Sequence, residues 1–94
     1  MILGEIYKKT NKEQLFVYRG EYDNNYLHYI FINKYGEVII KGVNGTGEIF
    51  KDPCRVATQE EREYFYEKIH MFGYHYNQSN IKVINLTTKE IIEQ

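Results

Sequence analysis

A helix start at residue 58 is the feature that most constrains what this 94-residue chain can fold into. Thr58 suits the N-cap position and Glu61 follows three residues later, so each residue's side chain can accept a hydrogen bond from the other's backbone N–H. This capping box predicts a helix over residues 59–72, which Gly73 then ends. The apolar face of the helix is expected to pack on a sheet and consists of Phe65, Tyr66, Ile69 and Phe72.

The first half of the chain consists of short, turn-bounded segments rich in β-branched and aromatic residues, which is typical of strands. The segment 26–33 is apolar on both alternating faces, which predicts a central strand covered on both sides. We expect a sheet over about 2–51, a last strand over about 81–86 and a polar tail over 87–94. The strands within that sheet are expected at 2–7, 15–19, 26–33, 37–43 and 48–51.

Four to six antiparallel strands and one helix in the C-terminal half make this an α+β fold, because the connections are too short for parallel crossovers. One possible arrangement is a small SH3-like half-open barrel that carries the helix. The other is a five-stranded antiparallel sheet with the helix across it. The length fits a single domain over residues 1–94.

The charge balance argues against two classes of function. Twelve Lys and Arg against thirteen Asp and Glu give a net charge of −1, and the two signs are interspersed along the chain. Duplex nucleic acid is bound largely through cationic contacts to phosphate, so this balance disfavours it, and DNA mimicry would need a strong negative excess. A lone Cys54, no signal pattern and no long apolar segment favour a cytoplasmic protein without a membrane span.

No catalytic or metal-binding signature emerges from the chemistry-bearing residues. The histidines and the single cysteine lack zinc-ligand spacing, although His70 and His75 flank the helix end and the fold can bring them together. Cys54 has no histidine near it in sequence and is expected to be an ordinary, partly buried cysteine. The glycine-rich segment 42–47 lies between strands, which favours a hairpin turn over a phosphate loop. We expect no enzyme activity, no metal and no cofactor.

The ten tyrosines are the anomaly of the composition, and they admit three interpretations. The tyrosine rings line the edge of a core with their hydroxyls in water, form a protein-contact surface, or stack on the bases of single-stranded nucleic acid. A contact surface is expected on the outer helix face and on exposed tyrosines of the sheet, at Tyr64, Lys68, Met71, Tyr22 and Tyr35. Stacking on nucleic acid would place a rim of lysines around the sheet tyrosines, formed by Lys8, Lys9, Lys12 and Lys34.

The segment Arg55-Val56-Ala57-Thr58-Gln59-Glu60-Glu61, with Phe72-Gly73-Tyr74 and Tyr76-Asn77 after the helix, resembles small uncharacterised proteins of bacteriophages and mobile elements. Their pattern is an N-terminal β segment, an "R-x-A-T-x-E-E" helix start, a "G-Y-x-aromatic-N" exit and a last strand. The resemblance covers residues 50–86, and this chain has Tyr76 where the pattern has Trp. It implies an accessory protein that binds a host or phage macromolecule, as an inhibitor of a host defence system for example, and it places no site residue.

We therefore expect a non-enzymatic accessory protein that binds a protein partner or a second copy of itself. The alternative is a single-stranded nucleic-acid-binding module that uses tyrosine stacking. The two differ in salt dependence, because binding to phosphate weakens steeply as salt rises.

Overall fold

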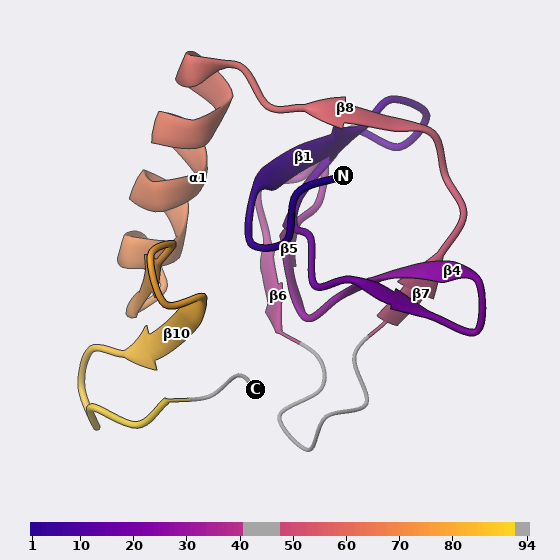
Figure 1. Ribbon diagram of the computed structural model, residues 1–94. Coiled ribbons are helices and arrows are strands. Elements are labelled where there is room, and N and C mark those ends of the chain that lie inside the picture. Colours follow the sequence, from indigo (N-terminus) through magenta and orange to yellow (C-terminus); the bar gives the residue numbers. More distant parts are fainter. Residues whose placement is uncertain (41–47, 92–94) are drawn as a thin grey trace.

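The computed structural model describes residues 1–40 and 48–91, and within those ranges the chain forms one helix and ten short strands (Figure 1). The expected α+β class, with a single helix in the C-terminal half, is confirmed. The strands outnumber the four to six expected because the segment 26–33 divides into two strands and three short strands lie outside the predicted ranges. The hairpin turn expected at 42–47 lies outside the described residues.

The strands form three antiparallel sheets. The largest has the order β6-β5-β2-β1-β8, in which the pairs β1–β2 and β5–β6 are consecutive in sequence. A three-stranded sheet has the order β3-β4-β7, and β9 pairs with β10 in a hairpin. The strands are β1 (Ile6–Lys9), β2 (Gln14–Val17), β3 (Glu21–Tyr22), β4 (Asn25–His28), β5 (Ile30–Ile32), β6 (Val38–Ile40), β7 (Glu48–Phe50), β8 (Cys54–Val56), β9 (Tyr74–Asn77) and β10 (Lys82–Asn85).

The five-stranded sheet is covered on both faces. One face carries mainly aliphatic side chains and the other mainly aromatic ones. Successive side chains of a strand point to opposite faces. In β5, Ile30 and Ile32 therefore belong to one core and Phe31 to the other. The aliphatic core consists of Ile6, Leu15, Val17, Ile30, Ile32, Ala57, Phe65, Ile69, Tyr76 and Val83. The aromatic core consists of Tyr7, Phe16, Tyr18, Phe31 and Phe50.

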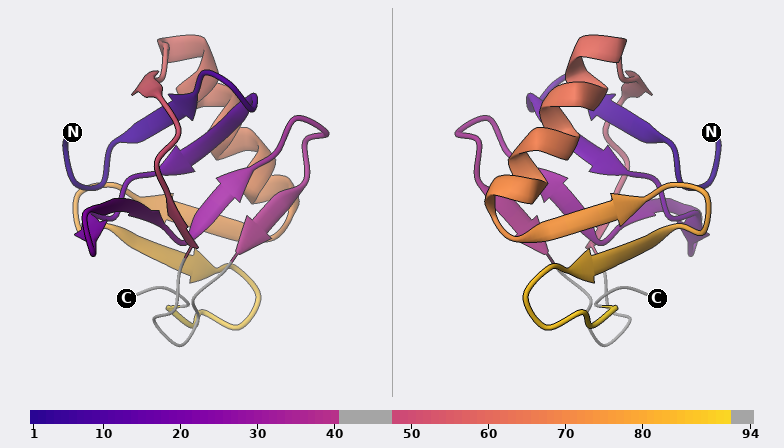
Figure 2. Two further views of the ribbon diagram at one scale, coloured as in Figure 1. Left: turned by 90° about the vertical axis from the view of Figure 1, so that its right-hand side faces the viewer. Right: turned by 90° about the vertical axis from the view of Figure 1, so that its left-hand side faces the viewer.

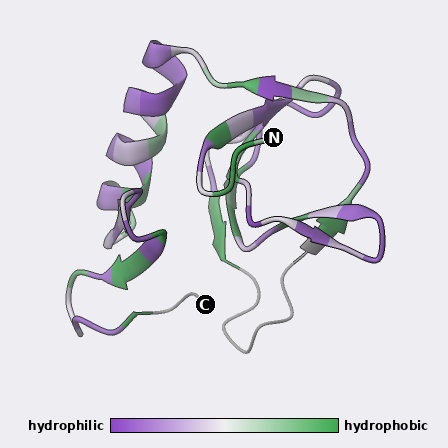
Figure 3. Cartoon of the chain, in the orientation of Figure 1, coloured by the Kyte–Doolittle hydropathy of each residue, from purple (hydrophilic) through white to green (hydrophobic). Residues whose placement is uncertain are grey.

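Helix α1 (Gln59–Met71) and the β9–β10 hairpin cover the aliphatic core (Figures 1 and 2). The predicted capping box of Thr58 and Glu61 is confirmed. Figure 3 shows that most of the helix is hydrophilic, in keeping with only Phe65 and Ile69 being fully buried on it. The expected core position of Phe72 is wrong, because Phe72 is the C-cap and its side chain is 50% exposed.

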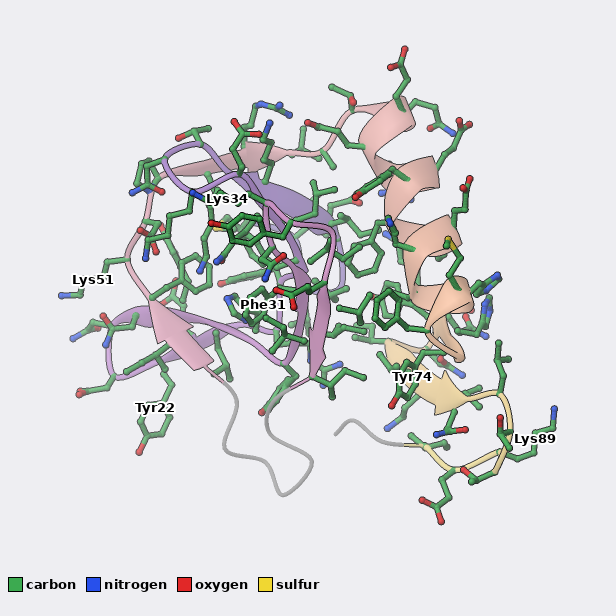
Figure 4. All side chains as sticks on the ribbon, turned by 180° about the vertical axis from the view of Figure 1, so that it is seen from behind. Tyr22, Phe31, Lys34, Lys51, Tyr74 and Lys89 are labelled. Atoms are coloured by element: carbon green, nitrogen blue, oxygen red, sulfur yellow. The ribbon has the colours of Figure 1, made fainter. Side chains whose placement is uncertain are left out.

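The three-stranded sheet covers the aromatic core, and this arrangement corrects the expected strand at 26–33. The chain bends at Tyr29, so β4 pairs with β7 while β5 pairs with β2 and β6. A straight strand over 26–33 would belong to a single sheet. The bend instead places β4 in the three-stranded sheet and β5 in the five-stranded sheet, and the Phe31 side chain lies between the two sheets. Phe31 accordingly lies deep among the strands (Figure 4).

Three strands were not predicted from the sequence. The first, β3, has only two residues and pairs with β4. β8 pairs with the free edge of β1, in a segment where no strand was expected. β9 was expected as an exit from the helix, but it pairs with all of β10 and buries Tyr76 in the aliphatic core. The predicted last strand at 81–86 is observed as β10, with Val83 fully buried.

Across the two described ranges, the single helix is neither long nor apolar enough to cross a membrane.

Candidate functional site

The turn between β5 and β6 is tightly built around Asn33. Its side-chain oxygen accepts hydrogen bonds from the N–H groups of Tyr35, at 2.9 Å, and Glu37, at 3.0 Å, and its amide donates to the Glu37 carboxylate at 2.8 Å. Gly36 closes the turn with φ +78°, a conformation that glycine adopts without strain. An Asn side chain that mimics a backbone turn in this way fixes the loop. The two residues at its tip, Lys34 and Tyr35, are therefore presented to solvent from a fixed base.

The same turn packs against the outer face of α1. A Cβ atom at Gly36 would lie 3.3 Å from the Lys68 Nζ and 3.3 Å from the Tyr64 hydroxyl oxygen. The backbone of the turn thus approaches two residues of the expected contact surface. The outer helix face and the turn therefore lie side by side, with the ends of the Lys68 and Tyr64 side chains close to Gly36.

A groove separates this turn from the turn between β1 and β2, which spans residues 10–13. The second turn is held in place by Asp52, whose carboxylate accepts from the Asn11 amide at 3.0 Å and lies 3.3 Å from the Lys12 ammonium. The groove comprises two adjoining cavities of about 490 and 330 Å³. Asn33, Lys34 and Glu13 line both of them, and we call the combined space the turn groove.

Charges in the turn groove are partly neutralised by one another. The Lys8 ammonium lies 3.2 Å from the Glu13 carboxylate and 3.5 Å from that of Glu61. Arg55 donates two hydrogen bonds to Glu61, at 2.8 and 2.9 Å. The Arg55 guanidinium, with help from the Thr58 N–H and Lys8, lowers the pKa of Glu61 to about 2, so this carboxylate is ionised throughout the neutral range.

Lys34 in the groove and Lys68 beside it differ from Lys8, because each lies near an aromatic ring and, among the described residues, not near a carboxylate. The Lys34 ammonium lies 5.2 Å from the ring centre of Tyr35, and the Lys68 ammonium lies 5.8 Å from that of Tyr64. Neither forms an ion pair with a residue in the described ranges. Lys34 is exposed and Lys68 is partly exposed, so an incoming anion can reach either ammonium. The groove therefore offers the Tyr35 and Tyr64 rings and the charge of Lys34, and Lys68 adds a second charge beside Tyr64.

The structure brings together three of the five residues expected at a contact surface. Tyr35 and Tyr64 are 76% and 42% exposed, and the Lys68 and Tyr64 side chains both approach Gly36, the residue after Tyr35. Met71 is exposed on the same helix but about 10 Å further along it, beyond the turn groove. Tyr22 is exposed on the β3–β4 hairpin, which lies on the opposite side of the molecule from the β5–β6 turn (Figure 2; Tyr22 and Lys34 are labelled in Figure 4).

The tyrosines of the sheet divide between core and surface. Tyr18 and Tyr29 are buried, so these two rings are not available for stacking on bases. The expected place of Lys9 at a lysine rim is wrong, because its side chain is 1% exposed and lies in the aromatic core. Lys12 and Lys34 are exposed, and both line the turn groove.

The remaining candidates have distinct environments. Cys54 lies on β8, and burial raises the pKa of its thiol, which disfavours the reactive thiolate. His28 is fully buried beside Phe16, Phe31 and Phe50. Residues 1–40 and 48–91 contain no group of three or more metal-ligating side chains.

Sequence reasoning missed the turn groove because it forms between segments far apart in the chain. The local signal was the Asn33-Lys34-Tyr35-Gly36 turn, in which an Asn and a Gly flank a basic and an aromatic residue. Nothing in the sequence shows that residues 10–13 face this turn.

Comparisons of the chain with protein-family models, with curated proteins and with solved structures found no match.

Proposed function

We propose that the protein is a non-enzymatic binding module that engages an acidic segment of a partner protein through the turn groove. The observation that carries this proposal is the pairing of exposed tyrosine rings with available lysines at Tyr35 and Lys34 and at Tyr64 and Lys68. Tyrosine is enriched at protein interfaces because its ring buries area while its hydroxyl keeps a polar partner. A carboxylate of the partner would bind the ammonium while an adjacent apolar group packs on the ring.

The charge of the groove supports a protein over a nucleic acid. Three lysines and two glutamates line it, so its positive excess is small. A nucleic acid strand carries a charge on every phosphate and is bound by tracks of cations with stacked aromatic rings. A short acidic peptide segment requires only a few positive groups, which this groove has.

The wider role follows from the sequence resemblance to small phage and mobile-element proteins. On that basis, the bound partner is a host or phage protein, and inhibition of a host defence system is the specific form we propose. The geometry of the turn groove supports the binding step alone.

Site-specific photo-crosslinking tests the location of the contact. A photoreactive phenylalanine derivative replaces Tyr35 in one variant and Tyr22 in another, and each variant is incubated with a bacterial lysate and irradiated. Both positions are exposed tyrosines in hairpin regions, at 76% and 66%, so Tyr22 is a matched control on the other side of the molecule. We expect a discrete protein adduct from position 35 and none from position 22.

Three further results are informative. Loss of the adduct in a Lys34→Ala background, with the fold intact by circular dichroism, would support the role of the paired lysine. An adduct that nuclease removes would favour the single-stranded nucleic-acid alternative. Equal adducts from positions 35 and 22 would contradict the turn groove as the contact surface.

A further inference from the structure

Two histidines far from the turn groove meet at the junction between α1 and β9. The Nε2 atom of His70, in the last turn of the helix, lies 2.8 Å from the Nδ1 atom of His75, at the second position of β9. The ring centres are 5.0 Å apart with the planes inclined at 40°. His70 is exposed and His75 is partly exposed, so solvent reaches the pair.

The backbone around the pair is fixed. Gly73, with φ +89°, reverses the chain, and its N–H donates to the His70 carbonyl at 2.9 Å. Its own carbonyl accepts from the Leu86 N–H at 2.8 Å, which ties the junction to the end of β10. One residue beyond His75, Tyr76 is buried in the aliphatic core. The two rings are thus held on separate elements whose relative positions the fold determines.

We propose that His70 and His75 form a binding site for a divalent first-row transition metal ion such as Zn²⁺, Ni²⁺ or Cu²⁺. Imidazole nitrogen is a preferred ligand of these ions. With metal–nitrogen bonds of about 2.0–2.1 Å, two nitrogens at neighbouring positions of one ion lie about 2.9–3.4 Å apart. The observed separation of 2.8 Å is close to this span.

Metal binding replaces the hydrogen bond between the rings. In the metal-free pair one of the two facing nitrogens carries the proton and the other accepts. For both to bind a metal, that ring adopts its other neutral tautomer, with the proton on its outward nitrogen, and both rings turn so that their lone pairs converge. Because both rings are accessible to solvent, water completes the coordination. A two-histidine site of this kind remains open to a further donor from a bound molecule.

Zn²⁺ titration of the isotope-labelled protein, followed by NMR of the histidine rings, tests the proposal. We expect the ring signals of His70 and His75 to shift together with Zn²⁺ concentration. The buried ring of His28 is an internal control and should not respond. Competition with a chromophoric zinc indicator then gives the affinity.

Variants separate this site from a competing pair of sulfur ligands. Cys54 Sγ lies 3.7 Å from Met1 Sδ and offers sulfur donors elsewhere on the surface. His70→Gln and His75→Gln should each weaken Zn²⁺ binding at least about tenfold, since even the loss of an outer partner of a metal ligand costs about 10–100-fold. Cys54→Ser should leave the affinity unchanged.

Other outcomes would overturn the proposal. Ring signals of His70 and His75 that stay constant at millimolar Zn²⁺ would exclude the site. Unchanged affinity in His70→Gln, or loss of binding in Cys54→Ser, would assign the metal to other residues. Both histidines lie at the surface, so the glutamine variants are expected to fold, and their far-ultraviolet circular dichroism checks this directly.

Discussion

The aliphatic and aromatic cores are built from the same three strands, β1, β2 and β5, yet they enclose different chemistry. The aliphatic core holds branched side chains, the helix residues Phe65 and Ile69, and Tyr76. The aromatic core encloses the ammonium group of Lys9, which lies 4.2 Å from the ring centre of Phe50 and 3.7 Å from the Asp52 carboxylate. One face of the sheet thus encloses a core without a charged side chain among the described residues, whereas the core on the other face encloses a charge.

This difference shows what allows a charged side chain, that of Lys9, to be buried in so small a protein. A buried ammonium is costly unless an opposite charge and other favourable contacts compensate its lost hydration. Asp52 supplies the charge and the rings of Phe16, Phe31 and Phe50 face the ammonium, at 4.2–6.0 Å from their centres. The Asn11 hydrogen bond, with Lys12 and Lys9, lowers the pKa of Asp52, so its negative charge is available at neutral pH.

Removing Asp52 is expected to have the largest effect on stability. Asp52→Ala leaves the Lys9 ammonium in the aromatic core without its carboxylate and also releases Asn11 and Lys12. We expect the free energy of unfolding to fall by about 2–3 kcal/mol, somewhat below the usual cost for a fully buried pair because the Asp52 side chain is 13% exposed. Chemical denaturation measures this loss.

A double-mutant cycle with Lys9→Met sharpens the comparison. Methionine fills a similar volume without a charge, so Asp52→Ala should cost less than half as much in the Lys9→Met background. An equal cost in both backgrounds would show that Asp52 acts only by anchoring the β1–β2 turn. The aromatic core would then resemble the aliphatic one in gaining no stability from a buried ion pair.

The two cores also differ in how far the sequence predicted them. The capping box and the 3.6-residue spacing identified α1 and its buried residues Phe65 and Ile69, because these signals are local. Alternating apolar faces in 26–33 correctly indicated a strand covered on both sides. The same pattern does not reveal the bend at Tyr29, which depends on pairing of β4 with the distant β7.

The candidate site was predictable only in part for the same reason. Tyr35, Tyr64 and Lys68 were recognisable as exposed residues from helical spacing and turn signals. Their meeting at Gly36 depends on the packing of the β5–β6 turn against the helix, which no periodicity encodes. Lys9 shows the converse error, since a lysine in a polar-looking run is expected at the surface unless the position of Asp52 is known.

Measuring the free energy of unfolding at acid pH compares Glu61, on the helix that covers the aliphatic core, with the Lys9–Asp52 pair of the aromatic core. The pKa of Glu61 is about 2 in the folded protein, below the ordinary value of about 4.3 expected when unfolded. A lowered pKa contributes stability that is present above about pH 4.3 and is lost as the pH falls toward 2. With 22% of the side chain exposed, solvent screening reduces this contribution to about 1–2 kcal/mol.

Glu61→Gln should therefore lower the free energy of unfolding at pH 7 by that amount and flatten its decline between pH 5 and pH 2. Glu60→Gln, on the same turn of the helix, is the matched control and should retain most of the wild-type pH dependence. Thermal unfolding followed by circular dichroism across this pH range measures both. A Glu61→Gln profile parallel to the wild type would assign the acid sensitivity to Asp52 and the aromatic core instead.

The smallest stability effect is expected on the outer helix face, which belongs to neither core. Tyr64 and Met71 are 42% and 68% exposed, so replacing both with Ser should change the free energy of unfolding by less than about 1 kcal/mol. If the turn groove binds a partner, the same change should weaken the crosslink formed from position 35, because the Tyr64 ring lines the groove. Met71→Ser alone should leave it intact, since Met71 lies beyond the groove. Unfolding of the double variant would instead show that Tyr64 and Met71 stabilise the packing of the helix on the aliphatic core. The outer helix face would then belong to the core and not to a binding surface.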